Sequence, residues 1–436
     1  MRIHEIRLHN FRAFEELELH LEPQLTVLIG RNGAGKTTVL EGLAVALGAW
    51  LSGFKGIHED YAIPRSAAHL RSTEHGGLPS VEASFPVRVE TKGTVLAVET
   101  SWERELRSAD GRTTSGGASE VRSLAGAVED EGLSGPNPSA LPVLAYYGTG
   151  RLWLHKRDRK GEKSNLKSRL QGYRAALEAA SDQKGLEAWM AWREEDRLQR
   201  VARAEEEGRS ITEVRSPELE AVSAAACGCL EGAKRIHYSA NYQELRVDFE
   251  TGPSIPFHDL SDGQRNLIAV AADIAWRATQ LNPHLGAEAP TKAEGVVLID
   301  EVDLHLHPAW QRRVLEDLTR VFPGIQFIVT THSPQVMSTA PPGSVRLIDS
   351  AHQVHRVERT MGKDTNSLLE DILGVSARPR EWQDKLDELA RRIDDGELVE
   401  AKVLLAELAS SLGEDDAQVV AARWELSMAE TGDAED

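Results

Sequence analysis

Apolar and polar residues alternate along the first thirty positions of the chain. Residues 2–11 and 16–21 repeat with a period of two, which predicts strands with one buried face. Residues 24–29 form the short apolar run of a fully buried strand, and a helix is expected from about 36 to 51.

The next part of the chain mixes extended and irregular segments. Residues 81–106 predict two antiparallel strands joined by a turn at Lys92-Gly93. The stretch 107–140 is rich in glycine, serine, proline and acidic residues without periodicity, so we expect a mobile loop. Residues 141–148 read as another buried strand, which ends at Gly148.

Helical periodicity dominates residues 163–234. One helix there is expected to begin after Ser216-Pro217, a capping residue followed by proline at the first helical position. Two short strands follow before residue 251, and beyond about 360 the chain is again helical and charged.

Strands and helices alternate between residues 260 and 350, which predicts an α/β fold with a mostly parallel core sheet and flanking helices. The hairpins near 1–25 and 81–106 predict an antiparallel β layer beside that sheet. A helical insertion and a helical C-terminal extension complete the expected architecture.

The segment from Gly30 to Thr37 matches the pattern G-x-x-x-x-G-K-[ST], between a predicted strand and a predicted helix. Glycines let backbone N–H groups wrap phosphates, a lysine charge faces the β- and γ-phosphates, and a hydroxyl reaches Mg²⁺. The predicted nucleotide-binding residues are Arg31, Asn32, Gly33, Ala34, Gly35, Lys36, Thr37 and Thr38.

Two carboxylates, Asp300 and Glu301, follow the apolar run 296–299. The carboxyl end of such a strand is the usual ligand edge of a parallel sheet. We expect Asp300, with Thr37, to hold Mg²⁺, and Glu301 to act as the general base that activates the attacking water.

Residues 260–265, Leu-Ser-Asp-Gly-Gln-Arg, resemble the LSGGQ signature of ABC ATPases, with Asp262 in place of a glycine. The resemblance implies that Ser261, Gly263 and Gln264 bind the γ-phosphate held by a second subunit. Taken alone, the segment also fits a capped helix start.

His332 follows the predicted strand 326–331 and fits a switch histidine that contacts the γ-phosphate. The turn 303–308 contains two histidines, His305 and His307. It is expected to line a dimer interface and to end in Pro308 as the first residue of a helix, and a metal site is the alternative.

Tyr146 to Arg151 end a strand where ABC ATPases carry a glutamine, which this chain lacks. Thr149 or Arg151 are candidates to replace it, and a structural glycine turn is the alternative. Residues 156–169 carry seven basic and two acidic residues, so they form either a solvated loop or a phosphate-contacting patch.

The overall composition excludes several classes of protein. The net charge of −19 repels nucleic acid at long range, so DNA contact would need a local basic patch. No apolar run approaches the roughly 20 residues of a membrane span, and residues 1–5 lack a signal-peptide pattern, so we expect a cytoplasmic protein. Cys227 and Cys229 are too few for a disulfide framework or a zinc site.

Residues 3–44 and 298–336 are similar to the RecF/SMC/OLD group of cytosolic ABC ATPases. Three further segments, 146–153, 260–266 and 362–379, resemble the PtuA-like ATPases of Septu and retron anti-phage systems. This resemblance implies ATP bound between two subunits and a partner nuclease, of the HNH type in Septu. Asp262 and the additional stretch between the signature and Asp300 depart from the pattern and could slow hydrolysis.

The sequence therefore predicts an ATPase core at 1–155 and 235–360, a helical insertion at 156–234, and a helical extension at 361–436 that could dock a partner. The main hypothesis is an ATP- and Mg²⁺-dependent regulatory ATPase of a defence complex, acting as a homodimer or larger homo-oligomer. The alternative is a RecF/SMC-like repair ATPase that binds DNA, and nucleic acid could also be reached through a partner. An autonomous nuclease is disfavoured because no acidic triplet on predicted strands follows His332.

Overall fold

A computed structural model describes residues 1–57, 61–75, 78–131, 138–150, 168–179, 183–211, 214–372, 374–376 and 378–432. The chain forms two compact units, Met1–Lys363 and Asp364–Asp436, and each is described by itself.

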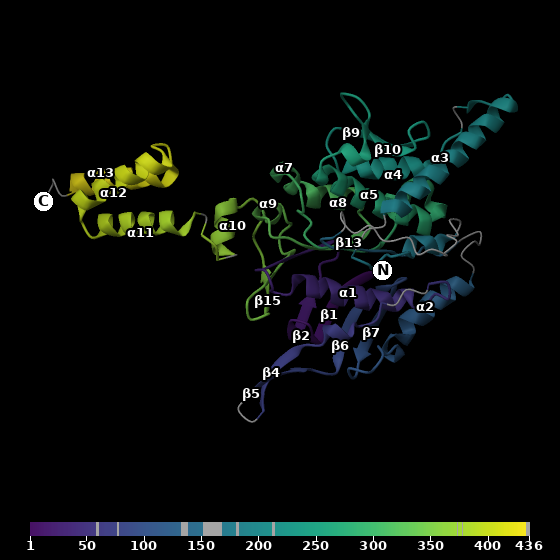
Figure 1. Ribbon diagram of the computed structural model, residues 1–436, viewed down its shortest axis with the longest axis horizontal. Helices are drawn as coiled ribbons and strands as arrows, with labels where there is room; N and C mark the ends of the chain where they lie inside the picture. The colour runs from purple at the N-terminus through teal and green to yellow at the C-terminus, as the bar shows by residue number, and fades with distance from the viewer. Residues whose placement is uncertain are drawn as a thin grey trace. The chain divides into compact units, whose positions relative to one another are not determined.

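A six-stranded sheet crosses the centre of the first unit (Figure 1). Five strands run parallel, and the edge strand β15 is antiparallel to β14. Every residue of the four strands β8, β12, β13 and β3 is buried, which explains their continuous apolar runs. In order across the sheet, the strands are β15 (Val354–Val357), β14 (Val345–Ile348), β3 (Leu25–Ile29), β13 (Ile325–Thr330), β12 (Gly295–Ile299) and β8 (Val143–Tyr147).

A four-stranded antiparallel sheet forms the predicted second layer. Helix α1 (Lys36–Leu51) contacts both this sheet and the central one, and it is buried along nearly its whole length. The indole N–H of Trp102 donates to the carbonyl oxygen of Ala46 at 3.0 Å, which ties the sheet to the helix. In order, the strands are β2 (Phe14–His20), β1 (Arg2–Phe11), β6 (Val87–Val95) and β7 (Val98–Leu106).

Two expectations for this region were wrong. The turn between β6 and β7 lies at Leu96 and Ala97, both with positive φ, while Lys92 and Gly93 lie inside β6. The stretch expected to be a loop contains helix α2 (Ser119–Asp130), whose apolar residues pack against α1 and β7. The hairpin of β4 (Leu70–His75) and β5 (Leu78–Ala83) lies between α1 and β6 in the sequence.

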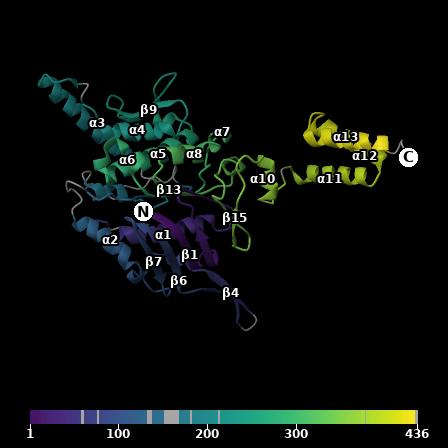
Figure 2. The same cartoon turned by 180° about the vertical axis from the view of Figure 1, so that it is seen from behind.

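Helices α3, α4 and α5 lie on the other side of the central sheet from α1 in Figures 1 and 2. Helix α4 packs against α5 and against strand β9 of a three-stranded antiparallel sheet. Ser216 and Pro217 stand at the start of α4 as predicted. These elements are α3 (Gln183–Glu206), α4 (Pro217–Gly228), α5 (Asp262–Leu281), β9 (Ala233–Ser239), β10 (Glu244–Phe249) and β11 (Ile255–Pro256).

Several connections between the larger elements of the first unit contain short helices. The additional stretch before Asp300 folds into a 3₁₀ segment (Pro283–Glu288) and α6 (Ala289–Lys292). After β12 come α7 (Pro308–Gln311), α8 (Val314–Val321) and α9 (Pro334–Met337). Within the described part of the chain, no helix combines the length and the apolar character that crossing a membrane requires.

The second unit has an apolar core of its own, centred on Leu389, Leu408 and Val419. Residues 364–436 carry 20 acidic and 7 basic side chains, a net charge of −13. Its helices are α10 (Thr365–Asp371), α11 (Arg380–Asp394), α12 (Leu398–Leu412) and α13 (Ala417–Gly432).

Candidate nucleotide-binding site

The glycine-rich loop connects β3 to α1 in a conformation that needs glycine. Gly30, Gly33 and Gly35 have φ values of 150°, 82° and 99°. A Cβ atom at Gly35 would lie 2.4 Å from the ring of Phe14, and one at Gly30 would lie 2.4 Å from the carbonyl oxygen of Ile348. The loop can therefore follow this path only without side chains at these positions.

Lys36 is buried at the start of α1. Its ammonium donates to the carbonyl oxygens of Gly30 and Arg31 at 2.9 and 3.2 Å, so it lies within the curve of the loop. Burial lowers the pKa of Lys36, while the charges of Asp300, Glu301 and Asp303 act in the opposite direction. The loop thus holds a positive charge beside the acidic end of β12.

Asp300 joins the loop to the two central strands. Thr37 donates its hydroxyl to Oδ2 of Asp300 at 2.8 Å, and Thr330 donates to Oδ1 at 2.6 Å. Asp300 is only 4% exposed. A carboxylate and a hydroxyl at this spacing are oxygen donors of the kind that Mg²⁺ prefers, so Thr37 and Asp300 fit a magnesium ion.

Glu301 occupies a left-handed backbone conformation, with φ of 48°. Its N–H donates to the hydroxyl of Thr330 at 2.7 Å, and the N–H of Leu304 donates to its carbonyl oxygen at 2.9 Å. For a residue with a side chain, this backbone costs about 1–2 kcal/mol. Such strain persists where surrounding contacts fix it, and here it accompanies a side chain that lines the pocket.

His332 follows β13, on the same sheet edge as Asp300. Burial and the nearby charge of Lys36 lower the pKa of its imidazole, which favours the neutral form at pH 7. The next residue, Ser333, donates its N–H to the hydroxyl of Thr331, which in turn donates to Asp303 at 2.6 Å. These bonds fix the strand end from which His332 projects.

One pocket of about 220 Å³ brings these groups together. Arg31 and Ala34 belong to the loop but do not line the pocket. The lining residues are Ala13, Asn32, Gly33, Gly35, Lys36, Thr37, Thr38, Asp300, Glu301 and His332.

The family model described as "AAA domain, putative AbiEii toxin, Type IV TA system" matches residues 25–338, from β3 to α9. The chain belongs to this family.

Several relatives of this chain are named as retron ATPases or Septu proteins. The chain is similar to the "Retron Ec83 probable ATPase" of Escherichia coli, with 25% identity over 98% of this chain and 86% of the relative. It is 26% identical to the "Retron Vc95 probable ATPase" of Vibrio cholerae serotype O1 biovar El Tor, over 80% and 74% of the two chains. The "Septu protein PtuA" of Bacillus mycoides (strain KBAB4) is 38% identical over 24% of this chain and 14% of that protein. The predicted resemblance to PtuA-like and retron ATPases is confirmed.

Among solved structures, an SMC head bound to the C-terminal winged-helix domain of ScpA aligns with a TM-score of 0.49 at 16% identity. The alignment covers 82% of this chain and 98% of that one.

The predicted signature residues, Ser261, Gly263 and Gln264, lie at the start of α5 and do not line the pocket of the same chain. The Ser261 hydroxyl accepts from the N–H of Gln264 at 3.4 Å, and the Gln264 side chain accepts from the N–H of Ser261 at 3.1 Å. Asp262 pairs with Arg265. A Cβ at Gly263 would lie 2.5 Å from the carbonyl oxygen of His305, so α5 packs tightly on the turn after β12.

The turn 303–308 ends as predicted, with Pro308 as the first residue of α7. His307 accepts from the N–H of Ala309 at 3.3 Å and caps that helix. Within the described ranges, the only group of at least three histidine, cysteine or acidic side chains close enough to share a metal is Glu5, Glu18 and His20. The described side chains thus do not gather a metal cluster at His305 and His307.

The structure adds residues that the sequence did not single out. Arg12 and Glu41 form an ion pair at 2.6 Å, and Ala13 beside Arg12 lines the pocket. Burial raises the pKa of Glu41, Arg12 lowers it, and the charge of Asp300 adds to the rise. The sequence did contain a signal that could have marked Glu41 as a candidate, because it is the only charged residue between Val39 and Leu51.

Two predicted features fall partly outside the described residues. Thr149 is exposed and does not line the pocket. Arg151 lies outside the described residues. Of the basic segment 156–169, only the last two residues are described. Arg169 is buried and donates to the carbonyl oxygens of Leu281 and Ser139 at 2.7 and 2.8 Å, so this arginine is structural and not a phosphate contact.

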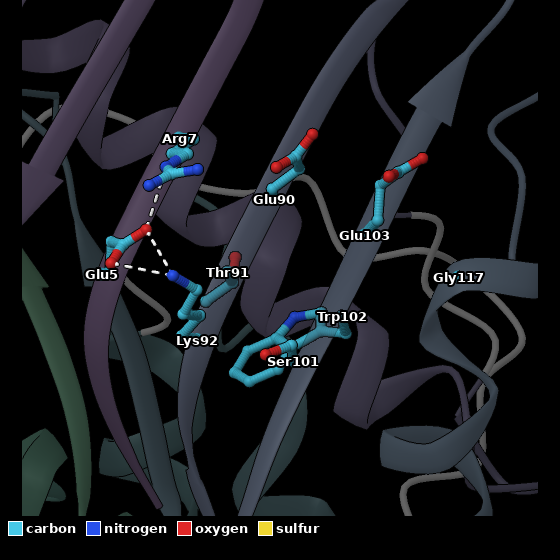
Figure 3. Close-up of a pocket in the computed structure, with 9 residues that line it drawn as sticks. All are labelled: Glu5, Arg7, Glu90, Thr91, Lys92, Ser101, Trp102, Glu103 and Gly117. Atoms are coloured by element: carbon cyan, nitrogen blue, oxygen red, sulfur yellow. Dashed lines mark hydrogen bonds and ion pairs between the residues drawn. The ribbon is translucent and has the colours of Figure 1, made fainter.

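A second hollow, of about 300 Å³, lies on the antiparallel sheet (Figure 3). Glu5 is paired with Arg7 of the same strand at 2.9 Å and with Lys92 of the adjacent strand β6 at 3.1 Å, and Figure 3 shows both pairs. The charges of this sheet face are therefore largely paired within the face.

Proposed function

We propose that this chain binds and hydrolyses ATP with Mg²⁺, closes around the nucleotide as a homodimer, and regulates a partner nuclease in bacterial anti-phage defence. The observation that carries the proposal is the pocket in which Lys36, Thr37, Asp300, Glu301 and His332 converge from three elements.

Each residue has a role that its position supports. Lys36 neutralises phosphate charge, and Thr37 with Asp300 binds Mg²⁺. Glu301 polarises the attacking water, and a neutral His332 contacts the γ-phosphate. The backbone N–H groups from Gly33 to Thr38 surround the phosphates at the start of α1.

Dimerisation is proposed because the pocket of one chain lacks the signature. Ser261 and Gly263 stand at the N-terminus of a twenty-residue helix, where the helix dipole favours negative charge. They do not line the pocket of their own chain. A second copy would present them to the bound γ-phosphate and so complete the site.

The defence role and the partner nuclease rest on the relatives. Proteins named as retron ATPases align over most of this chain, and a Septu PtuA protein aligns over part of it. Such a relationship favours a regulatory ATPase of a bacterial defence complex. The HNH type of the proposed partner nuclease comes from the resemblance of the sequence to Septu ATPases.

Glu301→Gln tests the proposed chemistry. The substitution preserves the size of the side chain and one acceptor oxygen but removes the base, so ATP should still bind while turnover falls about 100-fold or more. The variant should also accumulate as an ATP-dependent dimer in light scattering. Lys36→Ala is the matched negative control and should abolish ATP binding. Wild-type turnover in the Glu301→Gln protein would contradict the assignment of the base.

A further inference from the structure

The turn between β14 and β15 lies against the glycine-rich loop. His352 in this turn places Nδ1 3.1 Å from the carbonyl oxygen of Ala34. A carbonyl oxygen only accepts hydrogen bonds, so Nδ1 carries the hydrogen and donates it. The imidazole thus holds a backbone group of the loop from outside the set of residues that line the pocket.

The position of His352 is fixed by its own turn. The Asp349 carboxylate accepts from the N–H groups of Ala351 and Gln353 at 2.9 and 2.8 Å. The N–H of His352 donates to the carbonyl oxygen of Asp349 at 3.1 Å, and its backbone is left-handed with φ of 60°. The hairpin therefore holds the ring in place against the loop.

The His352 ring also packs on Phe14. The two ring centroids are 5.4 Å apart, with the planes at 78° in an edge-to-face arrangement. Phe14 is fully buried and is the side chain that closely approaches Gly35. His352 and Phe14 thus contact two consecutive residues of the loop, Ala34 and Gly35.

The bond to Ala34 determines where the next N–H points. The carbonyl of Ala34 and the N–H of Gly35 belong to one planar trans peptide unit, so they point in opposite directions. With the oxygen held by His352, the N–H of Gly35 is turned away from the hairpin. Gly35 lines the pocket, where its N–H is available to a phosphate oxygen.

We propose that His352 is a positioning residue for phosphate binding. Its Nδ1–H fixes the Ala34–Gly35 peptide plane, so that the Gly35 N–H is oriented before the nucleotide arrives. Glycine at position 35 would otherwise let this peptide rotate with little resistance. The inference rests on the proposed function only in that the pocket takes a nucleoside triphosphate.

His352→Gly and His352→Asn test the proposal in the full chain. Glycine keeps the left-handed backbone and removes the donor, so the Kd for ATP should rise about three- to tenfold, the worth of one hydrogen bond. The kcat at saturating ATP should change less than about twofold, because the groups at the γ-phosphate are untouched. Asparagine tolerates positive φ and carries an amide donor, so it should restore most of the affinity.

His355→Asn is the matched control, because it removes an exposed imidazole that pairs with Oδ2 of Asp349, whereas the N–H bonds that hold the turn go to Oδ1. It should bind ATP like the wild type in displacement of a fluorescent ATP analogue. A wild-type Kd in His352→Gly, or equal losses in the glycine and asparagine variants, would overturn the role of donation. Absence of ATP binding in the wild type would instead refute the proposed function itself.

Discussion

A single hydroxyl, that of Thr330, bonds both acidic residues of the candidate site, the side chain of Asp300 and the backbone of Glu301. It donates to Asp300 at 2.6 Å and accepts the N–H of Glu301 at 2.7 Å. A threonine at the end of β13 therefore sets the direction of the carboxylate proposed to bind Mg²⁺ and supports the left-handed backbone of the proposed base. Because it touches neither phosphate nor water in the proposal, its role is that of a positioning residue.

Thr330→Val should separate this role from nucleotide binding. Valine keeps the shape of threonine but loses a hydrogen bond to a charged group, worth about 1.5–3 kcal/mol. The kcat should fall roughly 10- to 100-fold, with ATP affinity nearly unchanged, in steady-state assays over a range of Mg²⁺ concentrations. Thr319→Val, which removes a hydroxyl bonded to Leu315 in α8, is the control. Equal turnover in both variants would contradict the role of Thr330.

At the scale of elements, the start of α5 and the turn after β12 form one connected structure. The side chain of Asn266 donates to the carbonyl oxygen of Leu304 at 2.9 Å, and Gly263 lies against His305. Gln311 donates to the carbonyl oxygen of Leu306 at 2.9 Å and accepts from the hydroxyl of Ser333 at 2.7 Å. The signature is thereby connected, within one chain, to the residue that follows His332.

Ser261→Arg should prevent closure of the dimer. The bulky cation stands where the proposed second subunit must approach, so ATP should still bind the single chain while turnover and ATP-dependent dimerisation are lost. Ser261→Ala is the control, because it also removes the helix cap, at a cost of about 1 kcal/mol, without adding bulk. Unchanged turnover in Ser261→Arg would refute the composite site.

The sequence predicted the central elements because their signals are local. Apolar runs that end in chemically distinctive residues marked β3, β12 and β13. The turn predicted at Lys92-Gly93 was wrong because Gly93 is needed for a contact with a distant strand. A Cβ there would lie 2.3 Å from the carbonyl oxygen of Arg2, so this glycine allows close approach of β1 near a register shift and does not make a turn.

The residues of other elements that line the pocket or support its loop could not be found in the same way. Ala13 and His352 come from turns, and neither turn carries a motif. They reach the loop only because β1 and β2 pair beside it and β14 pairs with β3. Motif spacing determines which groups react, whereas the supporting contacts depend on pairings between distant strands.

At the scale of the whole molecule, the pocket and the C-terminal helices belong to different compact units. Every residue that lines the pocket belongs to Met1–Lys363. A chain truncated after Lys363 should therefore keep a Kd for ATP within about threefold of the full chain, measured by analogue displacement. Loss of ATP binding in a truncated protein that still unfolds cooperatively would contradict this independence.

The charge of the second unit changes how the whole chain relates to other polyanions. With −13 of the net −19 in residues 364–436, the remaining 363 residues carry only −6. Long-range repulsion of a DNA backbone is thus concentrated in about one sixth of the polypeptide, and the ATPase unit is close to electroneutral for its size. In physiological salt, electrostatic fields decay over roughly 8 Å. A nucleic acid near the second unit would therefore be repelled more strongly than one near the first unit. Negative charge is distributed unevenly along the sequence, so the net charge of the whole chain describes neither unit.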